Sequence, residues 1–343
     1  MKNKSLSVRV AESTAVGEAR RAAMVFTGSL GFDEVKAGQV GIIVTELANN
    51  LWRHAGEGEI LFRGLTSNPA STASTAIQGI EILAVDKGPG MWSVEKCMED
   101  GYSTAGSTGI GLGAIARLSS FWEIYSRPKQ GTVSLSQVWA KPIPKSFFRR
   151  AQVGAVCVSL KDEAFCGDAW AEKNKEGNEQ ILLVDGLGHG IAAAKAADEA
   201  VRVFQEQPVG GTELIQAMHL ALKPTVGAVA GLVEIKAMDR ALSFIGIGNI
   251  EGRVFHGEET KRLLSYNGTL GPALEKVRNW NYSWGPNALL ILHTDGIGTR
   301  WELESYPGLI TRHPSVIAGV LYRDFRRERD DACVVVLREP PAG

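Results

Sequence analysis

The sequence predicts an α+β protein of two domains, and three observations support this expectation. The chain has 343 residues, of which 44% are hydrophobic, and this is enough to bury two ordinary cores. Helical periodicity and short apolar runs alternate in the first part of the chain, whereas short apolar runs dominate the second part. Between them, the segment 141–150 contains two prolines and four basic residues, and proline is disfavoured inside helices and central strands. We therefore expect domains at 1–140 and 151–343, joined by a linker at 141–150.

The elements of the first predicted domain follow from the spacing of its apolar residues. Helices are predicted at 12–30, 40–54 and 111–120. Strands are predicted at 60–65, 79–85 and 131–139. The segment 66–78 is rich in Ser, Thr, Asn and Pro, so we expect a mobile loop between two strands.

The second predicted domain contains mostly strands. These are expected at 153–160, 181–184, 228–235, 241–246, 252–256, 288–293 and 332–337. Helices are expected at 190–206, 212–222 and 314–321. No internal repeat of solenoid length is visible in the sequence.

Composition excludes several classes of protein. The formal net charge is -1 and there is no long basic run, so we expect no nucleic-acid partner. The N-terminus has no apolar core of signal-peptide length, and no apolar run reaches the roughly 18 residues of a membrane span. The four cysteines form no Cys-x-x-Cys pair, which fits reduced thiols in or near a core. We therefore expect a cytoplasmic protein without a membrane partner.

The first candidate site begins on the predicted helix 40–54. Glu46, Asn50 and His54 are four residues apart, so they share one helix face opposite an apolar face. An acid and an amide in one line fit a magnesium ion and its water. The same spacing also fits the polar outer face of an amphipathic helix, and this segment alone leaves both interpretations open.

Two glycine-rich segments follow. The predicted strand 79–85 leads into Asp86-Lys-Gly88-Pro-Gly90, where the acid can accept a hydrogen bond from an exocyclic amine and the glycines leave room for a flat ring. The segment 107–113 places several glycines at the start of a predicted helix, where free backbone amides can bind an anion. It is neither a Walker loop nor a Rossmann fingerprint, so its significance depends on its neighbours.

In their order along the chain, these segments resemble the GHKL family of ATPases and kinases, in particular the RsbT type of anti-sigma-factor serine kinase. The stretches that carry the match are Glu-Leu-Ala-Asn-Asn-Leu-Trp-Arg-His-Ala, Asp-Lys-Gly-Pro-Gly-Met and Gly-Ile-Gly-Leu-Gly-Ala-Ile-Ala-Arg-Leu. The resemblance implies a Bergerat-type α/β two-layer sandwich that binds Mg-ATP, with Asn50 as magnesium ligand and Glu46 as base or water-orienting acid. It also implies that Asp86 reads adenine and that residues 92–108 form a lid. The residues implied to hold the ring and phosphates are Gly88, Gly90, Gly109, Gly111, Gly113 and Thr132.

The second candidate site consists of acids at the ends of predicted strands. The apolar run 181–184 leads into Asp185-Gly186, and the run 288–293 leads toward Asp295-Gly296. Each Asp-Gly pair taken alone is more typical of a turn than of a metal ligand. Two further acids lie at strand ends in this prediction. Asp168 follows a strand, and Asp330 precedes one. Four such acids at one end of a sheet would repel one another unless cations neutralise them, which favours a dinuclear Mg or Mn site.

The order Gly-Asp, Asp-Gly-x-Gly-His-Gly, Thr-Asp-Gly and Asp-Asp-Ala resembles the SpoIIE branch of the metal-dependent PPM-type protein serine/threonine phosphatases, including the compact RsbX type. The resemblance covers about 152–337 and implies an αββα sandwich with two Mn²⁺ or Mg²⁺ ions. Asp185 is implied to bridge both ions as the catalytic centre. The other implied metal residues are Asp168 near the first ion, the Gly186 carbonyl, and Asp295 and Asp330 at the second ion.

Together the two resemblances imply a bifunctional partner-switching regulator. It would remove phosphate from phosphoserine or phosphothreonine of a STAS-domain protein, and its N-terminal domain would bind ATP and act as a serine kinase. A sigma factor or a second copy of the chain are further expected partners, and Phe147-Phe148 beside Arg149-Arg150 would fit domain docking or a dimer face equally well. The alternative is a module that binds an anti-sigma or STAS partner, in which ATP is a conformational ligand and catalysis is secondary.

Overall fold

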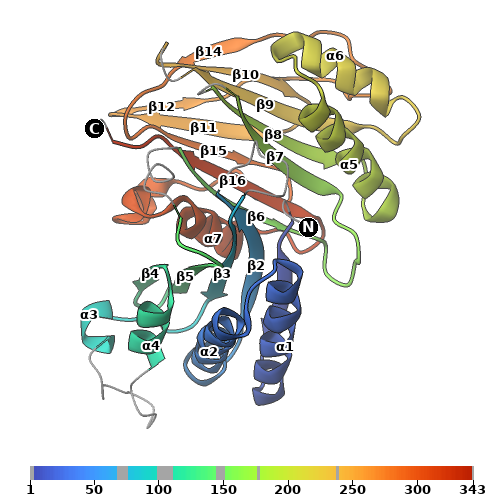
Figure 1. The fold of residues 1–343 in the computed structure, drawn as a ribbon. Coiled ribbons are helices and arrows are strands. Elements are labelled where there is room, and N and C mark those ends of the chain that lie inside the picture. The colour runs from blue at the N-terminus through green and yellow to red at the C-terminus, as the bar shows by residue number, and fades with distance from the viewer. Residues whose placement is uncertain are drawn as a thin grey trace. The chain divides into compact units, whose positions relative to one another are not determined.

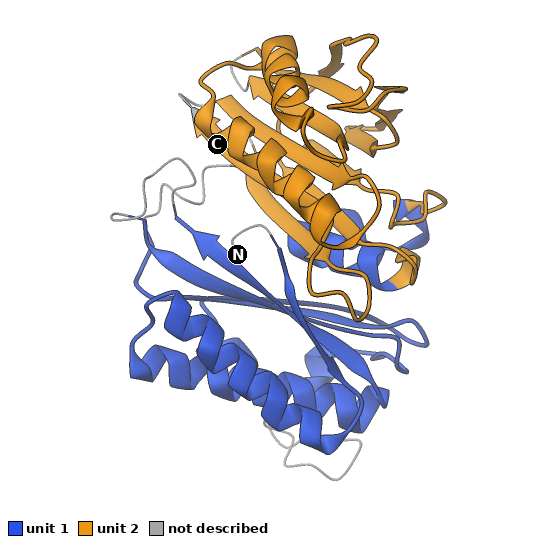
Figure 2. Ribbon diagram, turned by 90° about the vertical axis from the view of Figure 1, so that its right-hand side faces the viewer, with its two compact units in different colours: residues 1–144, 303–323 blue, residues 145–302, 324–343 orange. Residues whose placement is uncertain are grey.

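The computed structural model of the chain describes residues 4–67, 76–98, 111–143, 151–175, 178–236 and 239–341. These residues form two compact units, which Figure 2 shows in different colours. The first unit combines Met1–Pro144 with Leu303–Arg323, and the second combines Lys145–Glu302 with Asp324–Gly343. A short piece of the C-terminal half is therefore part of the N-terminal unit. Most of the predicted linker, including the Phe147–Arg150 segment, lies outside the described residues.

One antiparallel sheet forms the centre of the first unit. Its strand order is β1-β2-β3-β5-β4. The strands are β1 (Leu6–Val10), β2 (Gly58–Thr66), β3 (Gln78–Asp86), β4 (Phe121–Arg127) and β5 (Gly131–Trp139). Because side chains alternate between the two faces of a strand, each strand contributes to both faces of this sheet.

Helices cover one face of this sheet (Figure 1). They are α1 (Ser13–Ser29), α2 (Glu34–Asn50) and α4 (Gly111–Leu118), with the short α3 (Val94–Cys97) before α4. Apolar side chains of α1 and α2, such as Ala23 and Ile43, pack in one buried cluster with Ile60 and Ile82 of the sheet. This helix-on-sheet packing is the two-layer sandwich that the sequence predicted.

The helix α2 begins and ends with identifiable signals. The carboxylate of Asp33 accepts a hydrogen bond of 2.7 Å from the Lys36 amide, which caps the first turn. After Asn50 the chain forms a π-helical turn, Leu51–Ala55, and then leaves the helix at Gly56. The predicted helix 40–54 therefore ends in a π-helical turn and does not continue as α-helix to His54.

The opposite face of the same sheet is covered by residues 303–323. This segment contains two 3-10 turns, Leu303–Ser305 and Leu309–Thr311, and most of the helix α7 (Pro314–Phe325). A Cβ atom placed on Gly319 would lie 2.8 Å from Leu83 Cδ2 and 3.0 Å from Val133 Cγ1. The absence of a side chain at Gly319 thus lets α7 approach the sheet closely.

The second unit contains two sheets. The first has the order β13-β10-β9-β8-β7, and β14 also pairs with β10. Its strands are β7 (Asp168–Lys175), β8 (Asn178–Gly186), β9 (Ala228–Lys236), β10 (Ala241–Ile247), β13 (Ser265–Tyr266) and β14 (Trp280–Ser283). The second has the order β12-β11-β15-β16-β6. Its strands are β6 (Gln152–Val158), β11 (Glu251–His256), β12 (Glu259–Arg262), β15 (Leu289–His293) and β16 (Ala332–Arg338).

The two sheets of the second unit face each other across one apolar core. Trp170 and Phe244 of the first sheet belong to the same buried cluster as Leu292 and Val335 of the second. On its other face, the first sheet packs against α5 (Gly190–Glu206) and α6 (Gly211–Leu222), as Figure 1 shows. The helices α5 and α6 match their predicted bounds within one residue.

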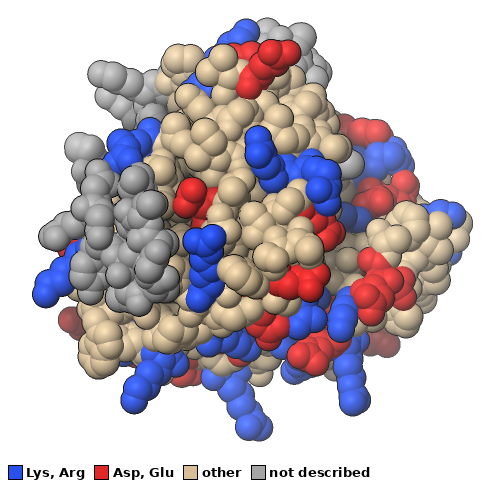
Figure 3. All heavy atoms as spheres, turned by 90° about the horizontal axis from the view of Figure 1, so that it is seen from below, with Lys and Arg blue, Asp and Glu red and all other residues tan. Residues whose placement is uncertain are grey.

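The fold also bears on what the sequence predicts for Asp168, the cysteines, membrane spans and surface charge. Asp168 is the first residue of β7 and does not follow a strand as interpreted from the sequence, because β6 ends at Val158. All four cysteines are free thiols, three of them buried, as expected. None of the helices in the described ranges is both long enough and apolar enough to span a membrane. On the face shown in Figure 3, basic and acidic side chains are interspersed.

Candidate functional site

The end of α2 lies against the start of α4. A Cβ atom built on Gly111 would lie 2.8 Å from Glu46 Oε2 and 4.0 Å from Asn50 Oδ1. The acid and the amide that are four residues apart on α2 therefore both face the first residue of α4. A larger residue at 111 would displace the Glu46 carboxylate, which explains the glycine at this position.

Asp86 is the last residue of β3 and anchors the loop that follows. Its Oδ1 accepts hydrogen bonds from the Gly88 amide at 2.8 Å and the Thr132 amide at 3.2 Å. Burial raises the pKa of Asp86, and the two amides and the Arg323 guanidinium offset part of this rise. The carboxylate is thus held in a fixed orientation in a partly dry environment, where it can accept a hydrogen bond from a ligand amine.

The loop after Asp86 packs directly on the turn between β4 and β5. Gly131 has a φ of +78°, and a Cβ atom there would lie 2.0 Å from the Asp86 carbonyl oxygen. A Cβ on Gly90 would lie 1.9 Å from the Arg127 carbonyl oxygen. Only glycine permits such a close approach of two backbones. Gly88 lies against Ala55, which follows α2 through the π-turn.

The remaining residues predicted to bind nucleotide are placed as follows. The Thr132 hydroxyl lies 2.9 Å from the Ser126 hydroxyl, which also accepts a hydrogen bond from the Met91 amide. Gly113 is buried in the first turn of α4. Gly109 lies outside the described residues, as does most of the predicted lid at 92–108. The structure thus brings Glu46, Asn50 and Gly111 together in one place, and Asp86, Gly88, Gly90 and Thr132 in another.

In the second unit, a cavity of about 530 Å³ opens beside the end of β8. Three of the predicted metal ligands line it, namely Asp185, Asp295 and Asp330. The other residues that line it are Leu187, Gly188, His189, Val229, Gly248, Asn249, Asn267, Gly268 and Arg329. Asp168 and Gly186 are not among these lining residues.

The carboxylates around this cavity influence one another electrostatically. The pKa of Asp185 is raised to about 7, first by burial and then by the negative charges of Asp295 and Asp330. Burial and the neighbouring Asp295 also raise the pKa of Asp330. Like charges this close disfavour ionisation of the group, and a bound cation would relieve the repulsion.

Asp168 lies behind this cavity. It pairs with Asp185 across the ladder of β7 and β8, and its side chain is only 1% exposed. Its Oδ2 accepts a hydrogen bond of 2.7 Å from the Thr294 hydroxyl, which in turn accepts one from the Cys333 amide. Burial and the charge of Asp185 raise its pKa well above the usual value. Asp168 is therefore fixed next to Asp185 in the interior.

Gly186 allows α5 to approach the end of β8. A Cβ atom at Gly186 would lie 2.2 Å from the Ala193 carbonyl oxygen, so no side chain fits there. The Gly186 amide donates to the Gly167 carbonyl at 3.0 Å, which ties the turn after Asp185 to the loop before Asp168. This packing fixes the direction in which the Asp185 side chain leaves the strand.

Asp331 is an anchor that the sequence analysis did not separate from its neighbour Asp330. Its Oδ1 accepts from the Leu160 amide at 2.7 Å and its Oδ2 from the Gly167 amide at 2.8 Å. The Asp331 amide itself donates to Asp330 Oδ1 at 2.9 Å. With both carboxylate oxygens engaged, Asp331 holds the loop in place and leaves Asp330 to face the cavity. The sequence showed two adjacent acids at this position, but it did not show which of the two is buried.

Asn249 is a second residue that sequence reasoning did not select for this site. Its Nδ2 donates to Asp295 Oδ2 at 2.8 Å, so it orients one of the cavity carboxylates. The segment Gly246–Ile250 that carries Asn249 contains no acidic residue, so no signal in the sequence marked it as part of an acidic site. Arg329 was likewise missed, although it immediately precedes the acidic pair and lines the cavity.

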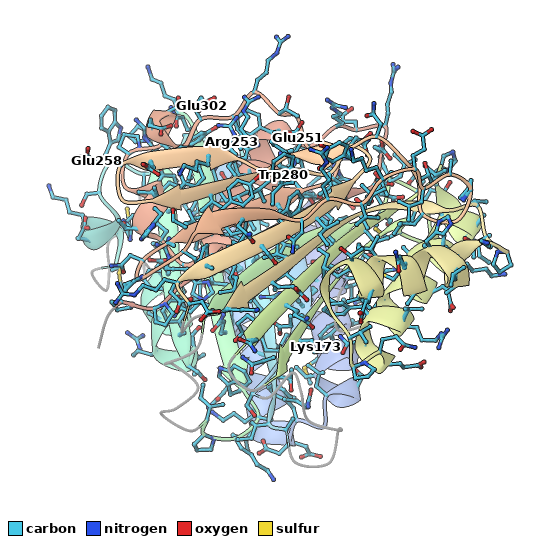
Figure 4. The ribbon with its side chains drawn as sticks, turned by 90° about the horizontal axis from the view of Figure 1, so that it is seen from above. Lys173, Glu251, Arg253, Glu258, Trp280 and Glu302 are labelled. Carbon is cyan, nitrogen blue, oxygen red and sulfur yellow. The ribbon has the colours of Figure 1, made fainter. Side chains whose placement is uncertain are left out.

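The loop that follows Asp295 is held by a separate cluster. Arg253 stacks 4.1 Å over the ring of Trp301 and pairs with Glu302 at 2.9 Å; Arg253 and Glu302 are labelled in Figure 4. The Trp301 indole donates to His293 Nε2 at 3.1 Å. Burial lowers the pKa of His293 to about 4, so this imidazole is neutral and can accept. The histidine therefore has a structural role.

The donor set of the cavity fits hard divalent cations, because carboxylate oxygens are their preferred protein ligands. Among the described residues, no three carboxylate, imidazole or thiol groups converge on a single point as in a preformed metal site. The mutual rise in pKa nevertheless places the acids within electrostatic reach of one another. The cavity is thus an open acidic site, and bound cations would draw its carboxylates together.

Comparisons with known proteins separate the two parts of the chain. Residues 10–137 match the histidine kinase-like ATPase domain family, and residues 175–340 match the stage II sporulation protein E (SpoIIE) family. The serine/threonine-protein kinase RsbT of Bacillus subtilis (strain 168) is 31% identical over 139 residues, which are 40% of this chain and 99% of RsbT. The phosphoserine phosphatase RsbX of the same strain is 24% identical over 145 residues, which are 41% of this chain and 71% of RsbX.

A solved structure described as the bacterial stressosome, a modular system adapted to control secondary messenger signalling, contains a similar chain. The two share 26% identity with a TM-score of 0.52, over 55% of this chain and 100% of the other. Together with the family matches, this similarity confirms the α+β fold class that the sequence predicted.

Proposed function

Since this chain belongs to the RsbT-like family of histidine kinase-like ATPases through its N-terminal part and carries a SpoIIE-type phosphatase domain after it, we propose that it is a bifunctional partner-switching regulator. Its phosphatase centre would be the acidic cavity of the second unit. Its nucleotide site would be the region around Asp86 and the facing ends of α2 and α4. The observation that carries the proposal is that Asp185, Asp295 and Asp330 line one cavity, in a chain whose N-terminal part matches the histidine kinase-like ATPase domain family.

In the proposed phosphatase centre, Asp185, Asp295 and Asp330 would hold two Mn²⁺ or Mg²⁺ ions, with Asp185 shared between them. Such a pair of ions supplies an activated water and neutralises the phosphoryl oxygens in an in-line displacement. The Gly186 carbonyl and the buried Asp168 would complete the surroundings of the first ion.

The other residues around the cavity position these ligands and the substrate. Asn249 orients the Asp295 carboxylate, and Asp331 fixes the loop that carries Asp330. Arg329 provides a guanidinium on the cavity wall, which suits a phosphoryl oxygen because guanidinium groups pair well with phosphate. No protein nucleophile is needed in this scheme, so phosphate would pass directly to water.

In the proposed nucleotide site, Mg-ATP would supply the phosphoryl group to be transferred. Asn50 would hold the magnesium ion, and Asp86 would accept a hydrogen bond from the adenine amine. Glu46, which faces the start of α4 beside Asn50, would accept the proton of the serine hydroxyl that attacks. The backbone at Gly109, Gly111 and Gly113 would bind the phosphates.

The proposed substrate is a STAS-domain protein that carries phosphoserine or phosphothreonine. Support comes from the similarity to a kinase and a phosphoserine phosphatase of one organism, and to a chain from a structure described as the stressosome. The two sites would then act in opposite directions on the same partner. Net flow of phosphate would depend on which site is saturated.

Phosphate release from a phosphorylated STAS protein tests the phosphatase. We expect release that requires Mn²⁺ or Mg²⁺ and falls by at least about 100-fold in Asp185→Asn, because the shared ligand is neutralised. The matched control is Asp239→Asn, which changes an exposed acid in a turn of the same unit. Unchanged turnover in Asp185→Asn, with the control also unchanged, would exclude the proposed centre.

Transfer of label from ATP to the dephosphorylated STAS protein tests the kinase. The assay uses the Asp185→Asn background, so that product is not removed. We expect transfer that is lost in Glu46→Gln and kept in Glu34→Gln, a change at the exposed start of the same helix. Nucleotide binding without transfer would favour the alternative in which ATP is a conformational ligand of a binding module.

A further inference from the structure

Residues 303–323 connect the two proposed sites along the chain. The sequence leaves β15 through Asp295, enters the N-terminal unit at Leu303, and returns through Asp324–Arg329 to Asp330. The two acids that would hold the second cation thus bracket a segment that folds with the nucleotide-binding unit. The segment is joined covalently at both ends to the loops that carry these acids.

Within the N-terminal unit, this segment is anchored to acids of the sheet. The Ser315 hydroxyl donates to Glu81 Oε2 at 2.7 Å, and the Tyr322 hydroxyl donates to Glu59 Oε2 at 2.9 Å. The His313 amide donates to the carboxylate of Glu123 at 2.6 Å. Ser315 and Tyr322 are both buried, so these bonds are shielded from water.

The same segment contacts the walls of the proposed adenine site at both of its ends. Near its beginning, the Ser305 carbonyl accepts a hydrogen bond of 2.9 Å from Arg127 Nη1. The carbonyl of Arg127 is the group against which Gly90 packs. At its end, Arg323 Nη1 lies 3.5 Å from the Asp86 carbonyl oxygen. Arg323 is 7% exposed, and this burial holds its side chain in position.

We propose that residues 303–323, with Arg323 as the positioning residue, complete the nucleotide site, and that they link nucleotide binding to cation binding at Asp185, Asp295 and Asp330. This inference rests on the proposed function. Nucleotide at Asp86 favours the arrangement in which Arg323 is docked. The loops at the two ends of the segment are joined by hydrogen bonds of 2.8 Å from the Gly298 amide to the Phe325 carbonyl and from the Arg327 amide to the Gly296 carbonyl, and cations at Asp295 and Asp330 favour this joined arrangement. Because both ligands select the same docked arrangement, each strengthens binding of the other.

The linkage is measured as the affinity of the full-length chain for a fluorescent ADP analogue in saturating Mn²⁺. We expect the unmodified protein to bind the analogue about 5-fold or more tightly than Asp185→Asn, whose cation pocket is impaired. In the Arg323→Gln background, the same Asp185→Asn change alters affinity less than about 2-fold. This double-mutant cycle isolates the coupling from effects of Mn²⁺ on the nucleotide itself.

Two further variants control for misfolding. Glu304→Gln changes an exposed side chain of the same segment and is expected to behave as the unmodified protein. Arg323→Lys keeps the positive charge and is expected to restore part of the coupling. If Arg323→Gln does not fold, Arg127→Gln removes the contact at the other end and is read in the same way.

Equal affinity of the unmodified protein and Asp185→Asn for the analogue overturns the linkage. That result leaves the proposed phosphatase intact if Asp185→Asn still abolishes phosphate release. Conversely, if the proposed phosphatase centre is wrong, release of phosphate does not depend on metal, whatever the nucleotide affinities are. The two failures are therefore distinguishable in the same set of proteins.

Discussion

The buried ion pair between Arg63 and Glu81 gives the most quantitative test of how residues 303–323 join the N-terminal unit. Arg63 Nε and Nη2 donate to Glu81 Oε1 at 2.9 and 2.8 Å, and both residues are at most 5% exposed. The other carboxylate oxygen accepts from the Ser315 hydroxyl and from Gln137. Glu81→Gln removes the carboxylate charge that faces the buried Arg63 guanidinium. We expect a loss of about 3–5 kcal/mol in the free energy of unfolding.

The pH dependence of this pair has a defined sign. Although burial raises the pKa of Glu81, the charges of Arg63 and His313 and the hydrogen bonds from Ser315 and Gln137 lower it overall below the usual value of 4.5. The folded state therefore binds this proton less readily than the unfolded state does. The stabilisation is present above about pH 4.5 and is lost as pH falls through the folded pKa. Glu81→Gln lacks this acid-dependent loss.

The assay is urea denaturation at pH 7, followed by tryptophan fluorescence. The double variant Arg63→Met/Glu81→Gln removes both charges, so most of the loss in the single variant should be recovered. Ser315→Ala isolates the contribution of the segment and is expected to cost about 1 kcal/mol. A Glu81→Gln protein as stable as the unmodified one would refute the argument that this carboxylate is a buried anchor.

Three further predictions concern the two sites. In metal-free protein, Asp185→Asn should stabilise the fold at pH 8 by up to about 4 kcal/mol, because a pKa raised to about 7 costs stability as pH rises from about 4 to 7; a thermal melt series against pH measures this, and a destabilised variant would contradict it. Arg329→Ala should raise the KM for a phosphorylated STAS protein about tenfold with a smaller change in kcat, since a charge-assisted hydrogen bond to phosphate is lost; steady-state kinetics with equal KM values would argue against this contact. Gly131→Ala should abolish binding of a fluorescent nucleotide, because a Cβ would meet the Asp86 carbonyl at 2.0 Å; retained affinity in calorimetry would show that the turn is not part of the site.

The elements with strong periodicity could be predicted from the sequence. The helix α5 has an alanine-rich apolar face and the strand β9 is a continuous apolar run, and both were predicted within one or two residues. The strands β1, β4, β7, β12, β13 and β14 were not predicted. β7 reads Asp-Ala-Trp-Ala-Glu-Lys-Asn-Lys and β4 contains Glu, Ser and Arg, so neither has a clear apolar run. Both lie at the edge of a sheet, where polar residues are tolerated.

The acids of the second unit could be identified because glycine turns and strand ends mark them in the sequence. Three of the acids named from the sequence line the cavity, but the sequence did not show that Asp168 lies behind it, because only tertiary contacts distinguish Asp168 from Asp185. The position of residues 303–323 on the sheet of the first unit also could not be predicted from the sequence. Its partners Glu81 and Glu59 are acids within strands, and the alternation that places them on one face does not identify what covers that face.

Anomalous diffraction from crystals of the full-length protein grown with Mn²⁺ locates the cations of the proposed phosphatase centre. We expect two manganese peaks in the cavity of the second unit, with the Asp185 carboxylate between them and Asp295 and Asp330 at the second peak. The same crystals of Asp185→Asn should lose at least one peak. Manganese bound away from Asp185, or two undisturbed peaks in the variant, would contradict the proposed phosphatase centre.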